Sequence, residues 1–439
     1  MTFQTTPKIT FVGAGSVVFT QGLLADLFAY PELDGVHVAL HDIDPDRLAT
    51  ALAAARRIAA VRGVKPVLTA HADRREALAG ADVAVNMVQI GMGAATRTDF
   101  EVPERYGVRQ TIGDTLGIGG IFRGLRTFPF LKALGEDIAE VCPEAWLLNY
   151  TNPMAMNVQY LSEATGLTRV VGLCHSVYWT VHGLAALVGV PFDEVTYVAA
   201  GVNHQAWVLR FEHAGADLYP RLRELAESDG QLRRRVRFDM LRRLGYYPTE
   251  TSEHSAEYVP WYLKHDTEID RLRLPIGDYL GIVAENEAEY ERTRRAIAAD
   301  EPLPVEGTGE YAPQIVHSLV TGTPRTVYGN VVNRGLIENL PSGGVVEVPC
   351  LVDGTGVRPT RIGALPPQLA ALNRTYLSVD DLVVRAAVED DPRHIRHAAM
   401  IDPATAAALP VERIFELCDD LVRAHGDRLQ PALRAVLGR

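Results

Sequence analysis

The sequence is poor in cysteine. Its 439 residues include four cysteines, no two of which form a C-x-x-C pair; they are Cys142, Cys174, Cys350 and Cys418. A disulfide framework is therefore not expected, and the spacing is typical of a protein in the reducing cytoplasm. In that compartment a functional cysteine would act as a thiolate.

Long hydrophobic runs and an excess of positive charge are also missing. No apolar stretch approaches the ~20 residues of a membrane-spanning helix, and the first residues carry no cationic start followed by an apolar segment. Acidic residues outnumber basic ones by 55 to 43, which gives a formal net charge of −12. Such a charge repels phosphate backbones and anionic lipids. We therefore expect neither a nucleic acid nor a membrane as a partner.

The composition is otherwise that of a globular protein. Hydrophobic residues make up 47% of the chain, and the 37 glycines and 26 prolines are close to average usage. Disordered and collagen-like architectures are therefore excluded, and the length predicts two or three domains.

Strands and helices alternate along the first part of the chain. Helical spacing predicts helices over 18–29 and 46–61, the second with Asp44 as its N-cap. Nearly continuous apolar runs predict parallel strands covered on both faces, over 9–12, 36–40, 66–70, 82–90, 146–151 and 168–173. This alternation is typical of an α/β fold with a Rossmann-like, doubly wound parallel sheet.

After about residue 170 the pattern becomes mixed. Residues 194–200 and 207–213 are strand-like, whereas 221–245, 279–298 and 379–425 have helical periodicity. No Gly/Ser-rich linker separates the two parts, so the second is expected to pack directly on the first. We predict one domain over 1–165 and a mixed α+β domain over 166–439.

A glycine-rich turn follows the first expected strand. Gly13, Gly15 and Ser16 lie between that strand and a helix, and Asp42 follows the second strand. Backbone amides in such a turn bind a pyrophosphate, and the acid binds the ribose hydroxyls of NAD in preference to NADP. Val18 stands where a third glycine would complete G-x-G-x-x-G, so a tight turn without a ligand is the alternative. The register of strand, turn, helix and acid favours NAD binding.

Cys174 and His204 each follow an expected strand, within CHSV and GVNH. Open α/β sheets bind their ligands at strand ends, and a thiolate beside an imidazole suits a borderline divalent metal. The alternative is a buried apolar cysteine and a hydrogen-bonded core histidine. Spacing alone favours that alternative, because a separation of thirty residues is no known metal signature.

Three further segments gather polar groups. Asp114 lies in a glycine-dense loop over 110–120, where it is either a catalytic acid or the cap of a local turn. Asn152 follows the strand that is expected to end near residue 151. Residues 246–261 place acids and a histidine among two prolines, tyrosines and a tryptophan. A charged run is usually a solvated face, but this mixture also fits the lining of a site.

Seven motifs occur in a fixed order along the chain: GAGS, GDTLG, NYTNP, CHSV, GVNH, TETSEHSAEY and VYGN. Together they resemble glycoside hydrolase family 4, the NAD- and metal-dependent glycosidases. CHSV and the TE-x-SEH-x-AEY segment are similar to those of the melibiase-type α-galactosidases. The resemblance implies an α-galactosidase that acts on a small oligosaccharide or glycoside. The α-glucosidases and α-uronidases (glucuronidases and galacturonidases) of the family are the alternatives.

The resemblance also implies the cofactors and the route. NAD⁺ oxidises C3 of the sugar to a ketone. A divalent metal, with Mn²⁺ expected first, polarises that ketone. A base then removes the C2 proton while the glycosidic oxygen leaves. Water then adds and the hydride returns, so the net reaction is hydrolysis without the usual carboxylate pair. Residues 1–165 would then bind NAD, and residues 166–439 would bind metal and substrate and form a homodimer or homotetramer.

Position by position, the resemblance assigns roles to five residues. Cys174 and His204 match the metal ligands, and His175 matches the general acid that assists the leaving group. Asn152 and Arg97 match residues that contact the substrate.

The base is assigned less directly. Asp114 matches an acid that supports the base, and relatives place a tyrosine or an aspartate within the segment equivalent to 248–258. We take Tyr258 as the base, with His254 and Glu250 as its rivals. A tyrosine acts near neutrality only if a metal or another cation lowers its pKa.

Two other classes of protein share the first domain. An NAD-dependent 2-hydroxy-acid dehydrogenase would release NADH at each turnover, which a glycosidase of this kind would not. A non-catalytic NAD-sensing or carbohydrate-binding protein would need no metal thiolate.

Overall fold

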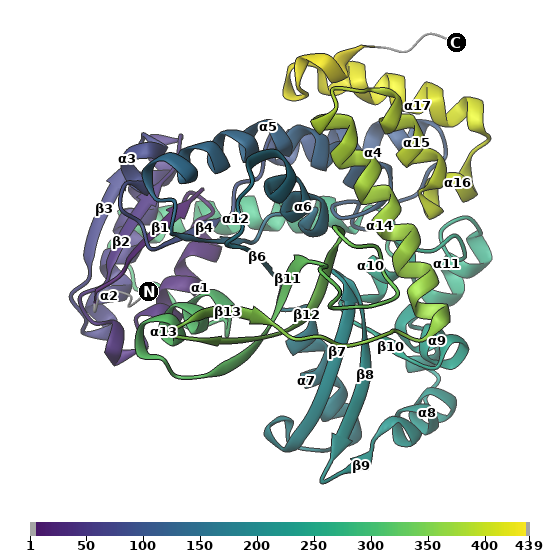
Figure 1. Cartoon of the computed structure of the whole chain (residues 1–439), viewed down its shortest axis with the longest axis horizontal. Helices are drawn as coiled ribbons and strands as arrows, with labels where there is room; N and C mark the ends of the chain where they lie inside the picture. Colours follow the sequence, from purple (N-terminus) through teal and green to yellow (C-terminus); the bar gives the residue numbers. More distant parts are fainter. Residues whose placement is uncertain (1–5, 436–439) are drawn as a thin grey trace.

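A parallel β-sheet forms the first part of the chain (Figure 1). The structure is a computed structural model that describes residues 6–435. Its parallel strands are β1 (Lys8–Val12), β2 (His37–His41), β3 (Val67–His71), β4 (Val83–Asn86), β5 (Trp146–Asn149) and β6 (Val170–Leu173). They lie in the order β3-β2-β1-β4-β5-β6. The predicted doubly wound α/β fold is confirmed.

Helices connect these strands: α1 (Val17–Leu27), α2 (Pro45–Arg62), α3 (Arg74–Leu78), α4 (Met92–Arg105), α5 (Gly117–Val141) and α6 (Met154–Thr165), with a 3₁₀ turn over Pro31–Leu33. Local signals fix α2 at both ends. The Asp44 carboxylate accepts hydrogen bonds from the amides of Asp46 and Arg47, and Gly63 ends the helix in the left-handed conformation.

Antiparallel strands extend the same sheet. The strands β7 (Val195–Val202) and β8 (Gln205–His213) form a hairpin, and β11 (Arg325–Val332) pairs with β12 (Val345–Asp353). Because β11 also pairs with β6, and β12 with β7, the sheet is continuous from the parallel strands to the hairpin. Short strands complete it at β9 (Ala216–Asp217), β10 (Tyr247–Pro248) and β13 (Gly356–Pro359).

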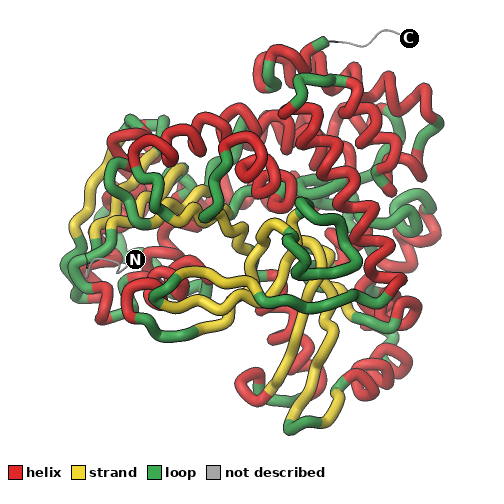
Figure 2. Tube along the Cα trace, viewed as in Figure 1, coloured by secondary structure: helices red, strands yellow, loops and turns green. Residues whose placement is uncertain are grey.

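The remaining helices follow in the second part of the chain, and several of them pack against helices of the first part (Figure 2). They are α7 (Ser176–Val188), α8 (Tyr219–Ser228), α9 (Val236–Leu244), α10 (Ser252–Glu257), α11 (Asp266–Leu272), α12 (Asp278–Ala298), α13 (Tyr311–Thr321), α14 (Pro367–Val388), α15 (Arg393–Ile401), α16 (Pro403–Ala408) and α17 (Val411–His425). Short 3₁₀ turns lie at Phe192–Glu194, Leu232–Arg234, Gly426–Arg428 and Pro431–Arg434. Among residues 6–435, no helix has both the length and the apolar character needed to cross a membrane.

The predicted domain boundary falls at the end of α6. The sheet continues across it, and α12 from the second part packs against α1, α2 and α4 of the first. The division at residues 165 and 166 therefore stays a prediction. The outermost residues of the two predicted domains, 1–5 and 436–439, lie outside the described residues.

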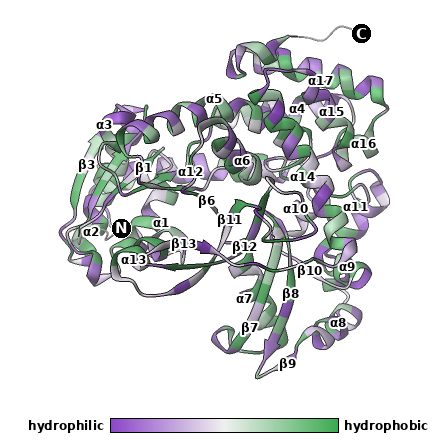
Figure 3. Cartoon of the chain, in the orientation of Figure 1, coloured by the Kyte–Doolittle hydropathy of each residue, from purple (hydrophilic) through white to green (hydrophobic). Residues whose placement is uncertain are grey.

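Hydrophobic burial explains how the hairpin is anchored. The first four residues of β8 are buried, whereas its outer half is partly exposed. Figure 3 shows a corresponding change from hydrophobic to hydrophilic residues toward the β9 end. The inner half therefore holds the hairpin turn, at residues 203 and 204, against the rest of the sheet.

Two predicted segments in the first part differ from the structure. The strand expected over 82–90 ends at Asn86, whose side-chain amide donates to Asn149 and Thr151 at 2.8 and 3.1 Å. The glycine-dense loop over 110–120 contains the start of α5. A Cβ atom on Gly120 would lie 2.6 Å from the backbone of Thr115, so this glycine permits close helix packing rather than a turn.

Of the three segments with helical periodicity in the second part, 279–298 corresponds to the single helix α12, whereas the other two contain several helices. The segment 221–245 is divided into α8 and α9 with a 3₁₀ turn between them, and 379–425 belongs to four helices. Pro392, Pro403 and Pro410 begin or precede helices in that tail, because the fixed φ of proline and its missing amide are tolerated in the first helical turn.

A buried ion network joins the C-terminal helices to the parallel part. The carboxylate of Asp99 on α4 lies 2.6 Å from a guanidinium nitrogen of Arg126 on α5 and 2.9 Å from Nε2 of His425 on α17. All three side chains are at most 2% exposed. Removing one partner from such a network leaves a buried charge without compensation.

We predict that Asp99→Ala lowers the free energy of unfolding by about 3–5 kcal/mol, because the Arg126 guanidinium then stays buried and unpaired. The control is Asp427→Ala, whose side chain is 98% exposed in its ion pair with Arg434. That substitution should lower the free energy of unfolding by less than about 1 kcal/mol. Urea unfolding of the two variants measures the difference, and equal losses would contradict the role of the network.

Candidate functional site

The end of β6 and the β7–β8 turn place a thiol and an imidazole side by side. Cys174 follows β6 directly, and His204 lies in the two-residue turn of the hairpin with φ +62°. The Cys174 Sγ atom lies 3.3 Å from His204 Nε2. The sheet therefore brings together the two residues that were predicted as metal ligands, although thirty positions separate them.

Glu250 adds a carboxylate to this pair. Its Oε2 atom lies 3.8 Å from Cys174 Sγ and 3.7 Å from His204 Nε2. Glu250 also has a left-handed backbone, with φ +67°, and its amide donates to the Thr180 hydroxyl at 3.1 Å. A thiolate, an imidazole and a carboxylate form a donor set that a borderline divalent metal accepts.

The protonation of the two ligands fits a metal site. Burial, with the neighbouring His254, lowers the pKa of His204 to about 4, so its ring is neutral near pH 7 and Nε2 can donate a lone pair. Burial, with the charges of Glu250 and Glu347, raises the pKa of the Cys174 thiol. A cation in this position would offset that effect by displacing the thiol proton.

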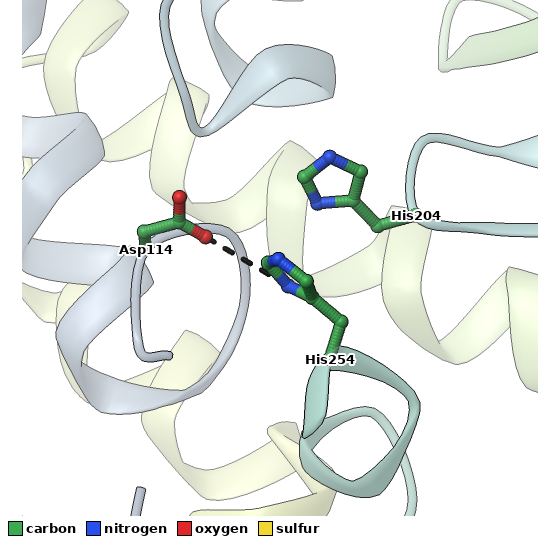
Figure 4. Close-up of side chains that lie close together, drawn as sticks. All are labelled: Asp114, His204 and His254. Carbon is green, nitrogen blue, oxygen red and sulfur yellow. Dashed lines mark ion pairs between the residues drawn. The ribbon is translucent and has the colours of Figure 1, made fainter. Parts of the chain in front are cut away.

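His204 also belongs to a second cluster, which it forms with Asp114 and His254 (Figure 4). Asp114 Oδ1 lies 3.9 Å from His254 Nδ1, and its Oδ2 accepts a hydrogen bond of 2.8 Å from the Asn152 amide. The Thr115 hydroxyl lies 2.6 Å from Asp114 and 3.0 Å from His204 Nδ1. Burial acts to raise the pKa of Asp114, but His254 and other facing charges lower it overall, so Asp114 is ionised.

The helix α10 places the candidate bases. The Thr251 hydroxyl caps it by accepting from the His254 amide, and the Tyr258 hydroxyl lies 2.8 Å from His254 Nδ1. Tyr258 is 2% exposed, and burial raises its pKa well above the usual value. His254 thus lies between Tyr258 and Asp114, while Glu250 contacts Cys174 directly.

His175 contacts a carboxylate outside the thiol–imidazole cluster. Its Nδ1 atom lies 2.6 Å from Oε1 of Glu310, whose side chain is 4% exposed, whereas His175 itself is 50% exposed. The hydrogen bond to Glu310 raises the pKa of His175. Sequence reasoning missed Glu310, because one acid before a helix at residue 311 gives no distinguishing pattern.

Two further residues that sequence reasoning missed support the site. The buried carboxylate of Glu257 accepts from the amides of Thr111, Ile112 and Gly113 at 2.7–3.0 Å, which fixes the loop before Asp114. Arg123 is buried on α5 and donates to the Asn152 carbonyl at 3.2 Å. A charged residue within the apolar run IGGIFRGL was the available signal for Arg123.

The glycine turn has the geometry of a dinucleotide cradle. The Gly13 amide donates to the His41 carbonyl at 2.9 Å, and the Gly15 amide donates to Asp42 Oδ2 at 2.8 Å. A Cβ atom on Gly15 would lie 2.4 Å from that carboxylate oxygen, so only glycine fits. Ser16 makes no side-chain cap at the start of α1. Binding of a pyrophosphate by Gly13, Gly15 and Ser16, and of the ribose by Asp42, stays a prediction.

Arg97 is not joined to the cluster by any contact among the described residues. It is exposed on α4, near Gly93 and the α12 residue Glu287. Its assignment to the substrate stays a prediction.

Comparison with known proteins covers nearly the whole chain. A model of the family 4 glycosyl hydrolases matches residues 8–190, and a model of the family 4 glycosyl hydrolase C-terminal domain matches residues 199–405. An alpha-galactosidase from Bacillus subtilis (strain 168) is 40% identical over 427 residues, which cover 96% of this chain and 99% of that protein. An alpha-galactosidase from Rhizobium meliloti (strain 1021) is 34% identical over 444 residues, with coverage of 98% and 90%.

Solved structures show the same fold. A 6-phospho-beta glucosidase from Thermotoga maritima, solved with manganese, NAD⁺ and glucose-6-phosphate, has a TM-score of 0.80 at 17% identity. The likeness covers 96% of this chain and 99% of that one. Together with the two matching models and the ordered motifs, these similarities show that the chain belongs to family 4 of the glycosyl hydrolases.

Proposed function

We propose that this enzyme is an α-galactosidase that hydrolyses terminal α-D-galactosides with bound NAD⁺ and a divalent metal, Mn²⁺ before others. The observation that carries the proposal is the 40% identity over 96% of the chain to an alpha-galactosidase. The thiol–imidazole–carboxylate cluster at the sheet's centre supports the metal, and the glycine cradle supports the dinucleotide.

Cys174 and His204 are the proposed metal ligands, and Glu250 offers a third donor within reach of both. When bound, the metal polarises the C2 and C3 oxygens of the galactosyl ring while NAD⁺ supplies reversible oxidation at C3. Asn152 and Arg97 are proposed to bind sugar hydroxyls. Gly13, Gly15, Ser16 and Asp42 are proposed to hold the dinucleotide.

His175 is the proposed general acid. Its Nδ1 atom is held by Glu310, so Nε2 is free to donate a proton to the glycosidic oxygen as the bond to C1 breaks. The buried carboxylate of Glu310 stabilises the protonated ring and fixes its orientation, as a carboxylate does for a catalytic histidine.

Tyr258 is the proposed base for the C2 proton, with Asp114 supporting it through His254. Burial of the phenol opposes its ionisation, so this role requires a nearby positive charge. Glu250 and His254 remain the rivals, because both lie nearer to the thiol–imidazole pair.

The proposed specificity for galactose is supported by the two alpha-galactosidases at 40% and 34% identity. An α-glucosidase or an α-galacturonidase, the activities of relatives at 26–28% identity, is the alternative within the family. A 2-hydroxy-acid dehydrogenase is disfavoured by membership of a glycosyl hydrolase family.

The setting of the enzyme is also a proposal. A cytoplasmic location is supported by the four free cysteines, since Cys174 must stay reduced to bind metal. The homodimer or homotetramer stays a prediction.

We expect p-nitrophenyl α-galactoside to be hydrolysed when NAD⁺, Mn²⁺ and a reductant are all present, and α-glucoside and α-uronides to react more slowly. NADH should not accumulate, because the hydride returns to the sugar. Cys174→Ser should abolish turnover and leave NAD⁺ affinity unchanged, because a serine hydroxyl is a poor donor to a borderline metal.

The matched control is Cys142→Ala, a buried cysteine outside the site, which should keep its turnover. Full activity of Cys174→Ser at low metal would contradict the ligand assignment. Preference for a glucoside or a uronide would contradict the sugar assignment alone.

Hydrolysis in D₂O should leave deuterium at C2 of the released galactose, because the C2 proton is exchanged through the base. Direct displacement at C1 never touches that hydrogen, so mass spectrometry separates the two routes. Tyr258→Phe should lose roughly 10²–10⁴-fold in turnover while still binding NAD⁺.

If Tyr258→Phe stays active while His254→Ala or Glu250→Gln fails, the base is one of those residues and the elimination route stands. If no deuterium appears at C2, the elimination route itself is wrong.

Glu310→Gln should slow the hydrolysis of melibiose by roughly 10–100-fold and that of p-nitrophenyl α-galactoside far less. The reason is that a nitrophenolate leaves without a proton, whereas a sugar alkoxide needs one. Rates of galactose release from the two substrates measure this. The control is Glu306→Gln, an exposed acid of the same loop. Equal losses on both substrates would show that Glu310 supports the fold rather than the acid.

A further inference from the structure

An exposed tryptophan lies one helical turn beyond the proposed general acid. Trp179 on α7 is 47% exposed, and its amide donates to the His175 carbonyl at 3.0 Å. Residues four apart lie on the same helix face, and their side chains lean toward the helix N-terminus. Trp179 therefore follows His175 by one turn on the same side of α7, and His175 is itself half exposed.

Other aromatic rings hold this indole in place. Tyr178 packs against it edge-to-face at 5.0 Å and 87°, and His182 does so at 5.3 Å and 71°. Phe192 lies 5.0 Å from Tyr178 and 5.4 Å from His182, so the four rings form one cluster at the surface of α7. Trp179 thus presents a large apolar surface to solvent, and its contacts with neighbouring rings restrict its orientation, which reduces the entropy lost when a ligand packs on it.

We propose that Trp179 forms a subsite for the sugar ring that leaves, by stacking on the apolar C–H face of a hexopyranose. This inference rests on the proposed function, and it names the ring beyond the galactosyl unit. The oxygen that takes the proton from His175 belongs to the leaving sugar, so that ring must lie beside His175, on the solvent side.

The geometry favours a hexose ring over other occupants. A flat indole can pack on a pyranose ring without hydrogen-bonding to each hydroxyl, and its N–H provides one polar contact at the edge. Three of the four rings, Tyr178, Trp179 and Phe192, carry no charge near neutral pH, and no ion pair among the described residues includes a member of the cluster. The expected consequence is binding of oligosaccharides of varied linkage, not selection of one aglycone.

The test compares methyl α-galactoside, which has no second ring, with melibiose, which has a second hexose of similar leaving-group basicity. Galactose release is measured for the NAD⁺- and Mn²⁺-loaded enzyme. Trp179→Ala should raise the KM for melibiose by about tenfold and leave kcat/KM for methyl α-galactoside within about twofold of wild type. Trp179→Phe should recover part of the loss, because a smaller ring still stacks.

The matched control is Leu187→Ala, which removes another exposed apolar side chain from α7 and should change neither substrate. Equal losses on both substrates for Trp179→Ala, or unchanged melibiose kinetics, would overturn the subsite. A change of oligomeric state in that variant with equal losses would show a contact between copies of the chain and would also overturn it. Wild-type enzyme that cleaves neither galactoside would refute the proposed function instead.

Discussion

The approach of Cys174 to His204 is the contact on which the rest of the site depends. The thiol lies at the end of a parallel strand, and the imidazole lies in the turn of an antiparallel hairpin. Their separation of 3.3 Å is possible because β11 and β12 bridge the two kinds of strand within one sheet. The parallel and antiparallel parts therefore cannot move independently without opening the proposed metal site.

Two residues at this contact have a strained backbone. His204 and Glu250 are two of the non-glycine residues that have a left-handed backbone among the described residues. Such a conformation costs of order 1–3 kcal/mol and persists only where the surroundings enforce it. The pairing of Val202 with Gln205 closes the turn around His204, and the Thr180 hydroxyl holds the Glu250 amide. Both strained residues direct a donor atom toward the same thiol.

Local signals explain which parts were predictable. The parallel strands and the Asp44 N-cap of α2 are each encoded by adjacent residues, and their prediction was confirmed or nearly so. The turn at Gly13 and Gly15 lies between β1 and α1 as expected, and its binding of NAD stays a prediction. Gly120 of α5 was placed in a loop because its role is close packing against Thr115, which depends on the tertiary fold. Glu310 was not predictable at all: its contact with His175 joins residues 135 positions apart and has no pattern at either end. The ordered motifs identified the family, but they could not show that Glu250 lies within reach of both predicted ligands.

The order of Cys174 and His175 separates two environments within one turn of chain. The thiol is directed to the buried donors His204 and Glu250, whereas the imidazole of His175 is directed to Glu310 and to solvent. Redox and proton-abstraction steps are faster in a site that excludes water, because electrostatic interactions are stronger there. The leaving sugar, by contrast, departs more easily from a site that is open to solvent. A strand end followed directly by a helix lets consecutive side chains serve both needs, with the acid at the boundary between them.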